Sequence, residues 1–363
     1  MRILIFPRDI RRSDNPYGEL LYRDMPRFGI EADRFSLWRA FWGRYDIFHL
    51  HWPEYYLNRS LLKALIGSLL VLFSTAWLRW RGTRILWTVH NPHSHALSHP
   101  AVEAWFWRIF TRLLDGFVSL SDSCTQWVST DARCLLQGES AVIPHGHYRQ
   151  AYPAPIARAR ARHVLGLTPQ QTVLLFFGGV SPYKNVPHLI RTFRGAALLD
   201  TILLIAGRAD SRHGRQVEMA AHGDPRIKLD LRRIPREEVQ LLFSAADLVV
   251  LPFSDIMHSG SAILALSFNK PVLVPAQGSL PELQARVGTD WVRTYPGELT
   301  PAILAEAAGW AKSSNREPRP DLSPFDWPHI VQATVELYSR LCARQLPLRQ
   351  HGQPAANIER QTV

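Results

Sequence analysis

The feature that most constrains the fold is an alternation of short apolar runs with helical stretches, which continues along most of the chain. Each run is rich in Val, Ile, Leu and Phe and is followed by turn or polar residues. Unbroken apolar runs of this length are typical of parallel strands that helices cover on both faces. The sequence therefore predicts an α/β fold. The runs occupy residues 2–7, 46–51, 84–90, 116–121, 140–146, 172–179, 201–207, 226–230, 247–252 and 270–275.

The alternation pauses once, over residues 151–171, which are rich in proline, alanine and arginine. We expect two doubly wound, Rossmann-like domains, over residues 1–155 and 156–325, that face a central cleft. A helix within residues 326–345 is expected to cross back to the first domain, and residues 346–363 to form a flexible tail. Open parallel sheets bind ligands beyond the carboxyl ends of their strands, so the cleft is the expected site.

The charge of the chain indicates an anionic partner. The formal net charge is +11 on 363 residues, of which 46% are apolar, so the chain is globular and basic. A phosphate-bearing substrate or an anionic membrane surface fits this charge better than nucleic acid, because no nucleic-acid recognition motif is present. Three cysteines without metal-ligand or CxxC spacing are typical of a reducing compartment, and the N-terminal apolar run is too short for a signal peptide.

Residues 61–78 are almost long and apolar enough to span a bilayer. A span would place the predicted strands before and after them on opposite sides of the membrane, where the two strands could not share a sheet. The segment is therefore either a buried crossover helix or a helix that lies in the membrane interface. Residues 38–45 and 105–114 also mix aromatic side chains with arginine, which suits the headgroup region. We expect a peripheral, monotopic protein on the cytoplasmic face of the bacterial inner membrane.

The stretch SGSAILALSFNKPVLVP, residues 259–275, follows the end of a predicted strand. Its first serine is typical of a helix N-cap. The alternative is a phosphate seat, because a helix N-terminus offers unpaired N–H groups to an anion and Gly260 permits close approach of the backbone. Ser259 and Ser261 would add hydroxyl donors.

A second loop, FFGGVSPYKNV, begins at the end of the first strand of the second domain. It is either a turn with an exposed lysine or a loop in which Lys184 neutralises a phosphate, with Gly178 and Gly179 allowing the ligand to approach. It is neither a Walker A motif nor a GxGxxG motif, so a dinucleotide fold is not expected.

Histidines gather where three predicted strands end, at residues 49–51, 90–95 and 145–147. Their spacing lacks the helical pair of a zinc protease, and no cysteine lies beside them, so no metal is expected. Each is either structural or part of an acid/base and hydroxyl-binding set at the cleft. No GxSxG motif supports nucleophilic catalysis.

Together these residues resemble a GT-B glycosyltransferase. More narrowly, the chain is similar to the family of bacterial GDP-mannose:glycolipid 4-β-D-mannosyltransferases of xanthan-type exopolysaccharide synthesis, over nearly its whole length up to about residue 340. The matching motifs are NPY with LLY (15–22), RYDIFHLHWPEYYL (44–57), HN of TVHN (88–91), HGHYR (145–149), PYKNV (182–186), LVVLP (248–252), SGS with LALSFNKPVLVP, and DLSPFDWPHI (321–330).

The resemblance implies transfer of mannose from GDP-mannose to a polyprenyl-diphosphate-linked oligosaccharide, with inversion and without a metal or other cofactor. The sequence contains no DxD triplet. Two alternatives stay open: a GT-B enzyme that uses another nucleotide sugar, and an inactive GT-B-like protein that binds glycan or lipid during assembly. The resemblance assigns the diphosphate to a donor-binding set comprising Gly178, Gly179, Lys184, Ser259, Gly260 and Ser261.

The resemblance also implies a general base in the first domain. Glu54 of HWPEY matches that role, with His51 and His90 as reserves, and Arg149 is expected to contact the donor or an acidic acceptor sugar. The chain departs from many retaining GT-B enzymes, which carry two glutamates eight residues apart. The corresponding positions are Ile256 and Leu264, so an inverting outcome is compatible with the sequence.

Overall fold

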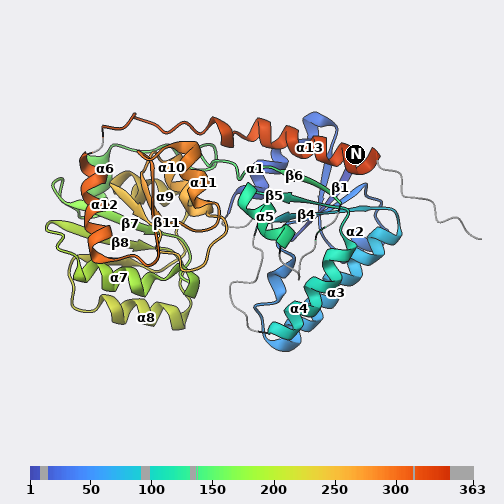
Figure 1. Ribbon diagram of the computed structural model, residues 1–363, viewed down its shortest axis with the longest axis horizontal. Coiled ribbons are helices and arrows are strands. Elements are labelled where there is room, and N and C mark those ends of the chain that lie inside the picture. The colour runs from blue at the N-terminus through green and yellow to red at the C-terminus, as the bar shows by residue number, and fades with distance from the viewer. Residues whose placement is uncertain (9–14, 91–98, 131–135, 137, 314, 344–363) are drawn as a thin grey trace, which may run out of the picture.

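The computed structural model describes residues 1–8, 15–90, 99–130, 136, 138–313 and 315–343. Two parallel sheets form the cores of two domains that lie side by side (Figure 1). The predicted α/β class and the pair of Rossmann-like domains are confirmed. Each predicted apolar run overlaps one strand of these sheets.

The first sheet has the strand order β2-β1-β3-β4-β5-β6, and every pair in it is parallel. Strands β3 and β5 are buried at every residue because helices cover both faces. The elements of this domain are β1 (Arg2–Phe6), α1 (Tyr17–Arg23), η1 (Met25–Phe28), β2 (Glu31–Arg34), α2 (Leu37–Trp42), β3 (Ile47–Leu50), η2 (Pro53–Tyr56), α3 (Leu61–Trp80), β4 (Arg84–Val89), α4 (Pro100–Phe110), η3 (Thr111–Leu113), β5 (Gly116–Ser119), α5 (Asp122–Thr130) and β6 (Glu139–Val142).

The second sheet has the order β12-β11-β10-β7-β8-β9 and is also parallel throughout. Its strand β8 is buried at every residue. The elements are α6 (Arg158–Val164), β7 (Thr172–Phe177), η4 (Pro182–Lys184), α7 (Val186–Gly195), β8 (Thr201–Ala206), α8 (Ser211–Ala221), β9 (Ile227–Asp230), α9 (Arg236–Ala245), β10 (Leu248–Val250), α10 (Gly260–Ser267), β11 (Val272–Pro275), α11 (Leu280–Val287), β12 (Val292–Tyr295) and α12 (Pro301–Ser313).

The chain returns to the first domain after α12. It passes through η5 (Ser323–Phe325) into α13 (Trp327–Ala343), which runs along the first domain (Figure 1). Tyr338 of α13 is fully buried and its hydroxyl lies 2.7 Å from Nδ1 of His49 on β3. The indole N–H of Trp327 donates to the carbonyl of His147, 2.6 Å away. These contacts attach the last helix to the carboxyl ends of the first sheet.

Helix α3 is the crossover between the neighbouring parallel strands β3 and β4. Within the part of the chain that the structure describes, it is the one helix long and apolar enough to cross a membrane. Of its most apolar 18-residue window 44% is buried against the domain, and the other residues of the helix are exposed or half-buried. The helix thus combines features of both alternatives drawn from the sequence: it is a crossover helix, but only one of its faces is covered.

Candidate active site

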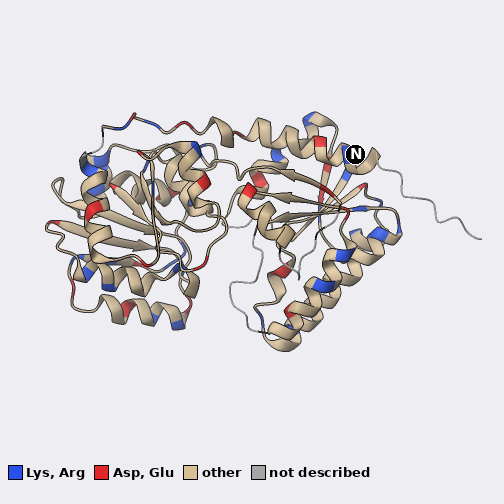
Figure 2. Cartoon of the chain, viewed as in Figure 1, with Lys and Arg blue, Asp and Glu red and all other residues tan. Residues whose placement is uncertain are grey.

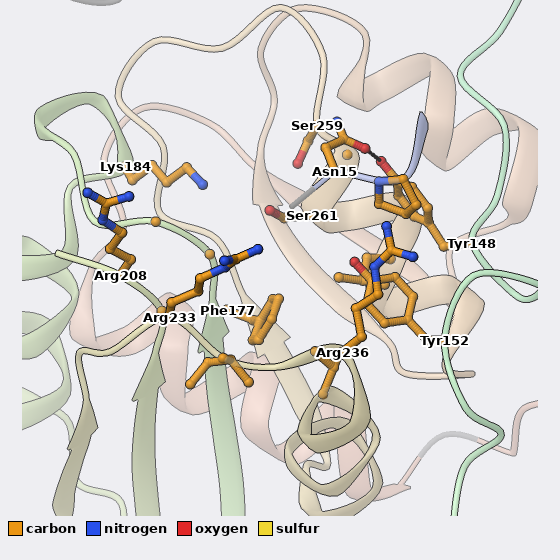
Figure 3. A pocket seen from close by; sticks show the side chains of 18 of the residues that line it. Asn15, Tyr148, Tyr152, Phe177, Lys184, Arg208, Arg233, Arg236, Ser259 and Ser261 are labelled. Carbon is orange, nitrogen blue, oxygen red and sulfur yellow. Dashed lines mark hydrogen bonds between the residues drawn. The ribbon is translucent and has the colours of Figure 1, made fainter. Parts of the chain in front are cut away.

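A cleft of about 940 Å³ lies between the two domains, at the carboxyl ends of the strands of the second sheet (Figure 3). The first domain contributes Asn15 and Glu19, at the start of α1 and within it, together with Tyr148 from the segment that follows β6. The second domain contributes the loops after β7, β8, β9 and β10. The location agrees with the rule that open parallel sheets bind ligands beyond their strand ends.

Gly178 brings the two predicted donor loops together. It follows β7 with φ of 137°, a conformation that favours glycine. A Cβ at this position would lie 2.7 Å from Nζ of Lys184 and 3.3 Å from Oγ of Ser261. Lys184 and Ser261, which are 77 residues apart in the sequence, therefore both lie beside Gly178. Gly178, Gly179, Lys184, Ser259, Gly260 and Ser261 all line the cleft.

Lys184 has no counterion in the part of the chain that the structure describes. Among the described residues, no carboxylate lies within ion-pair distance of its ammonium group. Nζ lies 5.9 Å from the ring centroids of both Tyr183 and Phe253. Burial lowers the pKa of Lys184 to about 8, because these surroundings disfavour the charged form. An anionic ligand in the cleft would supply the missing counter-charge.

The N-terminus of α10 combines a cap with an open first turn. Ser259 is the N-cap residue, and its hydroxyl accepts a hydrogen bond of 3.1 Å from the N–H of Ala262. The capping role read from the sequence is confirmed for Ser259. Ser261, two residues further on in the first turn, faces Lys184 in the cleft (Figure 3). Capping and anion binding are compatible, because a cap occupies only part of the donors of the first turn.

Three arginines at strand ends add positive charge that sequence reasoning missed. Arg208 follows β8, Arg233 follows β9, and Arg236 begins α9; all three line the cleft (Figure 3). The carboxylates in the lining are those of Glu19 and Glu237. Isolated arginines have no characteristic spacing, but the position of Arg208 and Arg233 just after predicted strands is a signal that could have identified them.

His258 is a further cleft residue that was not predicted. Its Nδ1 lies 3.1 Å from Oγ of Ser279, whereas Nε2 is buried and has no hydrogen-bond partner within the described residues. Burial, with a smaller contribution from His145, lowers the pKa of His258 to about 3, so the ring is neutral. A neutral imidazole with an unused nitrogen suits a ligand hydroxyl group.

Behind the cleft, the first domain contains a buried chain of histidines and tyrosines. Tyr22 hydroxyl lies 2.9 Å from Nδ1 of His49 and 2.5 Å from Nε2 of His51. Nδ1 of His51 lies 3.0 Å from Nε2 of His90. Burial is the main cause that lowers the pKa of His51 and His90 well below the usual range, so these rings are neutral at physiological pH.

Aromatic contacts connect this chain to the start of α10. The ring of Tyr17 lies 4.8 Å from the rings of both His90 and His145, measured between centroids. Nε2 of His145 lies 3.1 Å from the hydroxyl of Tyr148. A Cβ on Gly260 would lie 3.1 Å from that hydroxyl and 3.6 Å from Nε2 of His145. The glycine therefore permits close approach between the second domain's loop and the first domain's polar side chains.

Glu54, His51 and His90 do not line the cleft. Glu54 lies in η2, just after β3, and is 5% exposed. His93 and His95, also noted in the sequence, lie outside the described residues. The structure thus groups His51 and His90 in one buried chain behind the site, and the catalytic role of Glu54, His51 and His90 stays a prediction.

Arg149 lies away from the cleft. Its guanidinium donates to the carbonyl of Pro320 at 2.9 Å and to Oδ1 of Asn269 at 3.4 Å. The first bond holds the segment that leads to α13, and Arg149 is not among the residues that line the cleft, so its contact with the donor stays a prediction.

Groups of three or more His, Cys, Asp or Glu side chains that could hold a metal ion are absent from the described part of the chain. The residues that line the cleft therefore offer a diphosphate lysine, arginine and serine side chains together with the N–H groups of α10.

Comparisons with known proteins agree with this architecture. No family model matches the chain. It is 32% identical over 335 residues to the GDP-mannose:glycolipid 4-β-D-mannosyltransferase of Xanthomonas campestris pv. campestris, covering 90% of this chain and 88% of the relative. It is 27% identical over 196 residues to the D-inositol 3-phosphate glycosyltransferase of Mycolicibacterium gilvum, covering 52% and 44%.

Solved structures with the same fold extend over almost the whole chain. Sucrose-phosphate synthase of Thermosynechococcus elongatus has a TM-score of 0.70 at 17% identity, covering 94% of this chain and 99% of the other. The Anabaena protein HepE in complex with UDP and glucose has a TM-score of 0.64 at 18% identity, covering 94% and 100%.

Proposed function

The chain belongs to the family of the bacterial GDP-mannose:glycolipid 4-β-D-mannosyltransferases and is a GT-B glycosyltransferase, and from this premise we propose its donor and acceptor. The donor is GDP-mannose, and the acceptor is a polyprenyl-diphosphate-linked oligosaccharide of exopolysaccharide synthesis. The transfer inverts the anomeric configuration to give a β-mannoside. The identity with the Xanthomonas relative over most of both chains supports the choice of donor and acceptor.

The observation that carries the proposal is the convergence of Lys184 and Ser261 on Gly178. Transfer of a sugar from GDP-mannose leaves GDP, whose diphosphate gains negative charge as the glycosidic bond breaks. A lysine that no described carboxylate neutralises, beside a hydroxyl and a helix N-terminus, supports stabilisation of that charge. Arg208 and Arg236 would add positive charge at the same cleft.

Two apolar side chains that line the cleft support a role for the first domain in the chemical step. The two positions at which many retaining relatives of the fold carry glutamates are Ile256 and Leu264, and both line this cleft. Apolar side chains there cannot accept hydrogen bonds from the mannose or the ribose. The base that removes the proton of the acceptor hydroxyl would then come from the first domain, and we propose Glu54, with His51 and His90 as alternatives.

The unused Nε2 of His258 supports a contact to a sugar hydroxyl. His258 precedes the diphosphate loop directly, so a group bound there would lie next to the leaving diphosphate. Because the imidazole is neutral, it can either donate or accept this hydrogen bond.

The test is a transfer assay with a panel of nucleotide sugars and bacterial membrane extract as the acceptor source, followed by linkage analysis of the product. We expect a β-mannosyl product from GDP-mannose. A product formed from a uridine-linked sugar would show that the donor is not GDP-mannose. Donor binding without turnover would favour the inactive, GT-B-like assembly protein.

Glu54→Gln tests the base separately. We expect kcat to fall by about 100-fold or more while GDP binding stays unchanged, since the general base acts only in the chemical step. Full turnover by this variant would transfer the role to His51 or His90.

A further inference from the structure

Large exposed apolar side chains concentrate on two helices of the first domain. We define the α2–α3 ridge as Trp38 and Trp42 of α2 together with Leu62, Ile66, Leu69 and Phe73 of α3. Trp38 is 73% exposed and Trp42 70%. We propose that this ridge docks the protein onto the surface of an anionic lipid bilayer. The proposal concerns attachment alone and does not depend on the donor or the reaction.

The exposed residues of α3 form one stripe along the helix. Leu62, Ile66, Leu69 and Phe73 follow one another at intervals of three or four residues, which places them on one face over about 16 Å. The opposite face, with Val71 among its residues, is buried in the domain. An ordinary surface helix presents polar side chains to water, so a continuous apolar stripe on the outer face indicates a binding surface.

Aromatic contacts make the two helices one surface. The ring centroids of Trp38 and Trp42 are 5.7 Å apart. Phe41 of α2 lies 5.7 Å from Phe73 and 5.4 Å from Trp77 of α3, again between centroids. These aromatic side chains therefore form a continuous surface from α2 to α3. Tryptophan prefers the headgroup region of a bilayer, where its ring is apolar and its N–H remains hydrated.

The charge of this part of the chain favours anionic lipid over other partners. Between Glu54 and Asp115 the sequence contains seven Lys and Arg residues and a single carboxylate, Glu103, which is 5% exposed. Asp115 pairs with two of the seven, Arg79 and Arg84, which leaves five cations in this segment. Exposed Arg59 and Lys63 lie at the N-terminal end of α3, and Figure 2 shows Lys and Arg on the pair of helices α3 and α4. Anionic headgroups attract such cations. A second copy of this chain would instead bring like charges together across the contact.

The arrangement also gives the attachment a direction. Helix α3 is held by its buried face as the crossover between β3 and β4, so it would lie along the membrane and not cross it. Segment η2 packs on the same helix, because a Cβ on Gly67 would come within 2.3 Å of Cγ of Tyr56. If the proposed base is Glu54 of η2, which rests on the proposed function, docking would hold that residue's segment beside the lipid surface.

The experiment is vesicle flotation of the purified full-length protein. Vesicles of phosphatidylglycerol and phosphatidylethanolamine are compared with vesicles of phosphatidylcholine alone. We expect the wild-type protein to float with the anionic vesicles and to be released by alkaline carbonate. The double variants Leu62→Gln/Ile66→Gln and Trp38→Ala/Trp42→Ala should each lower the partition coefficient by about tenfold or more, since both remove apolar area that would leave water.

The matched control is Leu199→Gln/Met219→Gln, which replaces two exposed apolar side chains of the second domain that lie outside the ridge. It should float as the wild type does, and all variants should keep the wild-type circular dichroism spectrum and melting temperature. Flotation of the ridge variants at the wild-type level would overturn the proposal. Resistance to carbonate would show a spanning helix instead, and lipid-free dimers that the ridge substitutions dissociate would show an interface between copies.

Discussion

Glu19 of the first domain and Arg236 of the second form an ion pair across the cleft, with Oε2 of the carboxylate 2.9 Å from Nη1 of the guanidinium. Both residues line the proposed donor site. The Glu19 carboxylate therefore neutralises Arg236, a cation that could otherwise bind the diphosphate. The pair links the two domains, and a bound diphosphate would compete with Glu19 for Arg236.

Glu19→Gln should consequently tighten GDP binding. Because partly exposed ion pairs contribute up to about 1 kcal/mol, we expect an increase in affinity of up to about fivefold, with little change in stability. Isothermal titration with GDP measures this change. Weaker binding would mean that Glu19 itself supports the ligand.

Gly178→Ala should damage both stability and binding. The backbone φ of 137° is strained for alanine, and the new Cβ would meet Nζ of Lys184. We expect a loss of about 1–3 kcal/mol in the free energy of unfolding and about a tenfold loss in GDP affinity, as the lysine is displaced. Gly309→Ala is the control, because an added Cβ there meets no heavy atom within 4 Å. Equal effects of the two substitutions would contradict the assignment.

GDP binding should weaken as the pH rises through about 8, where the ammonium group of Lys184 loses its proton. Only the charged lysine attracts the diphosphate, so affinity is highest below this pKa and falls above it. Bound diphosphate favours the charged form and will move the midpoint upward. Titrations from about pH 6.5 to about 9.5 on the wild type and Lys184→Arg check the assignment, because arginine stays charged throughout this range. An unchanged pH dependence in Lys184→Arg would assign it to another group.

Tyr22→Phe should destabilise the first domain. The hydroxyl lies within hydrogen-bond distance of both His49 and His51, and its removal leaves buried ring nitrogens with fewer partners. We expect a loss of about 1–3 kcal/mol in the free energy of unfolding, measured in urea. Tyr55→Phe, at an exposed tyrosine of the same domain, should have little effect. An unchanged free energy of unfolding in Tyr22→Phe would show that the Tyr22 hydroxyl does not stabilise the buried histidines.

Transfer activity should survive metal removal. The proposed site stabilises the leaving diphosphate with Lys184, Arg208 and Arg236, so a divalent cation has no assigned task. Dialysis against EDTA should leave the transfer rate unchanged. A loss of rate that Mg²⁺ or Mn²⁺ restores would contradict this prediction.

Much of the fold could be predicted because buried parallel strands are continuous apolar runs. Two edge strands were missed: β2 has the polar sequence EADR, and β12 is the short run VRTY. The meeting of Lys184 and Ser261 is understandable afterwards, since β7 and β10 are neighbours in the sheet and both loops leave at the same edge. The arginines of the cleft had no spacing that distinguished them from surface arginines.

The outer face of α3 could not be assigned from the sequence for a physical reason. Both faces of this helix are apolar, so periodicity does not reveal which one packs against the sheet. The structure separates the two faces: Val71 lies on the buried face and Ile66 on the exposed one.

The most direct test of the central claim compares GDP with GMP binding by calorimetry in the wild type, Lys184→Ala and the control Lys312→Ala, which changes an exposed lysine on α12. The account predicts that the wild type and the control bind GDP about tenfold or more tightly than GMP, and that Lys184→Ala loses this preference. A preference for GDP that persists in Lys184→Ala would contradict the assignment of the diphosphate to this site.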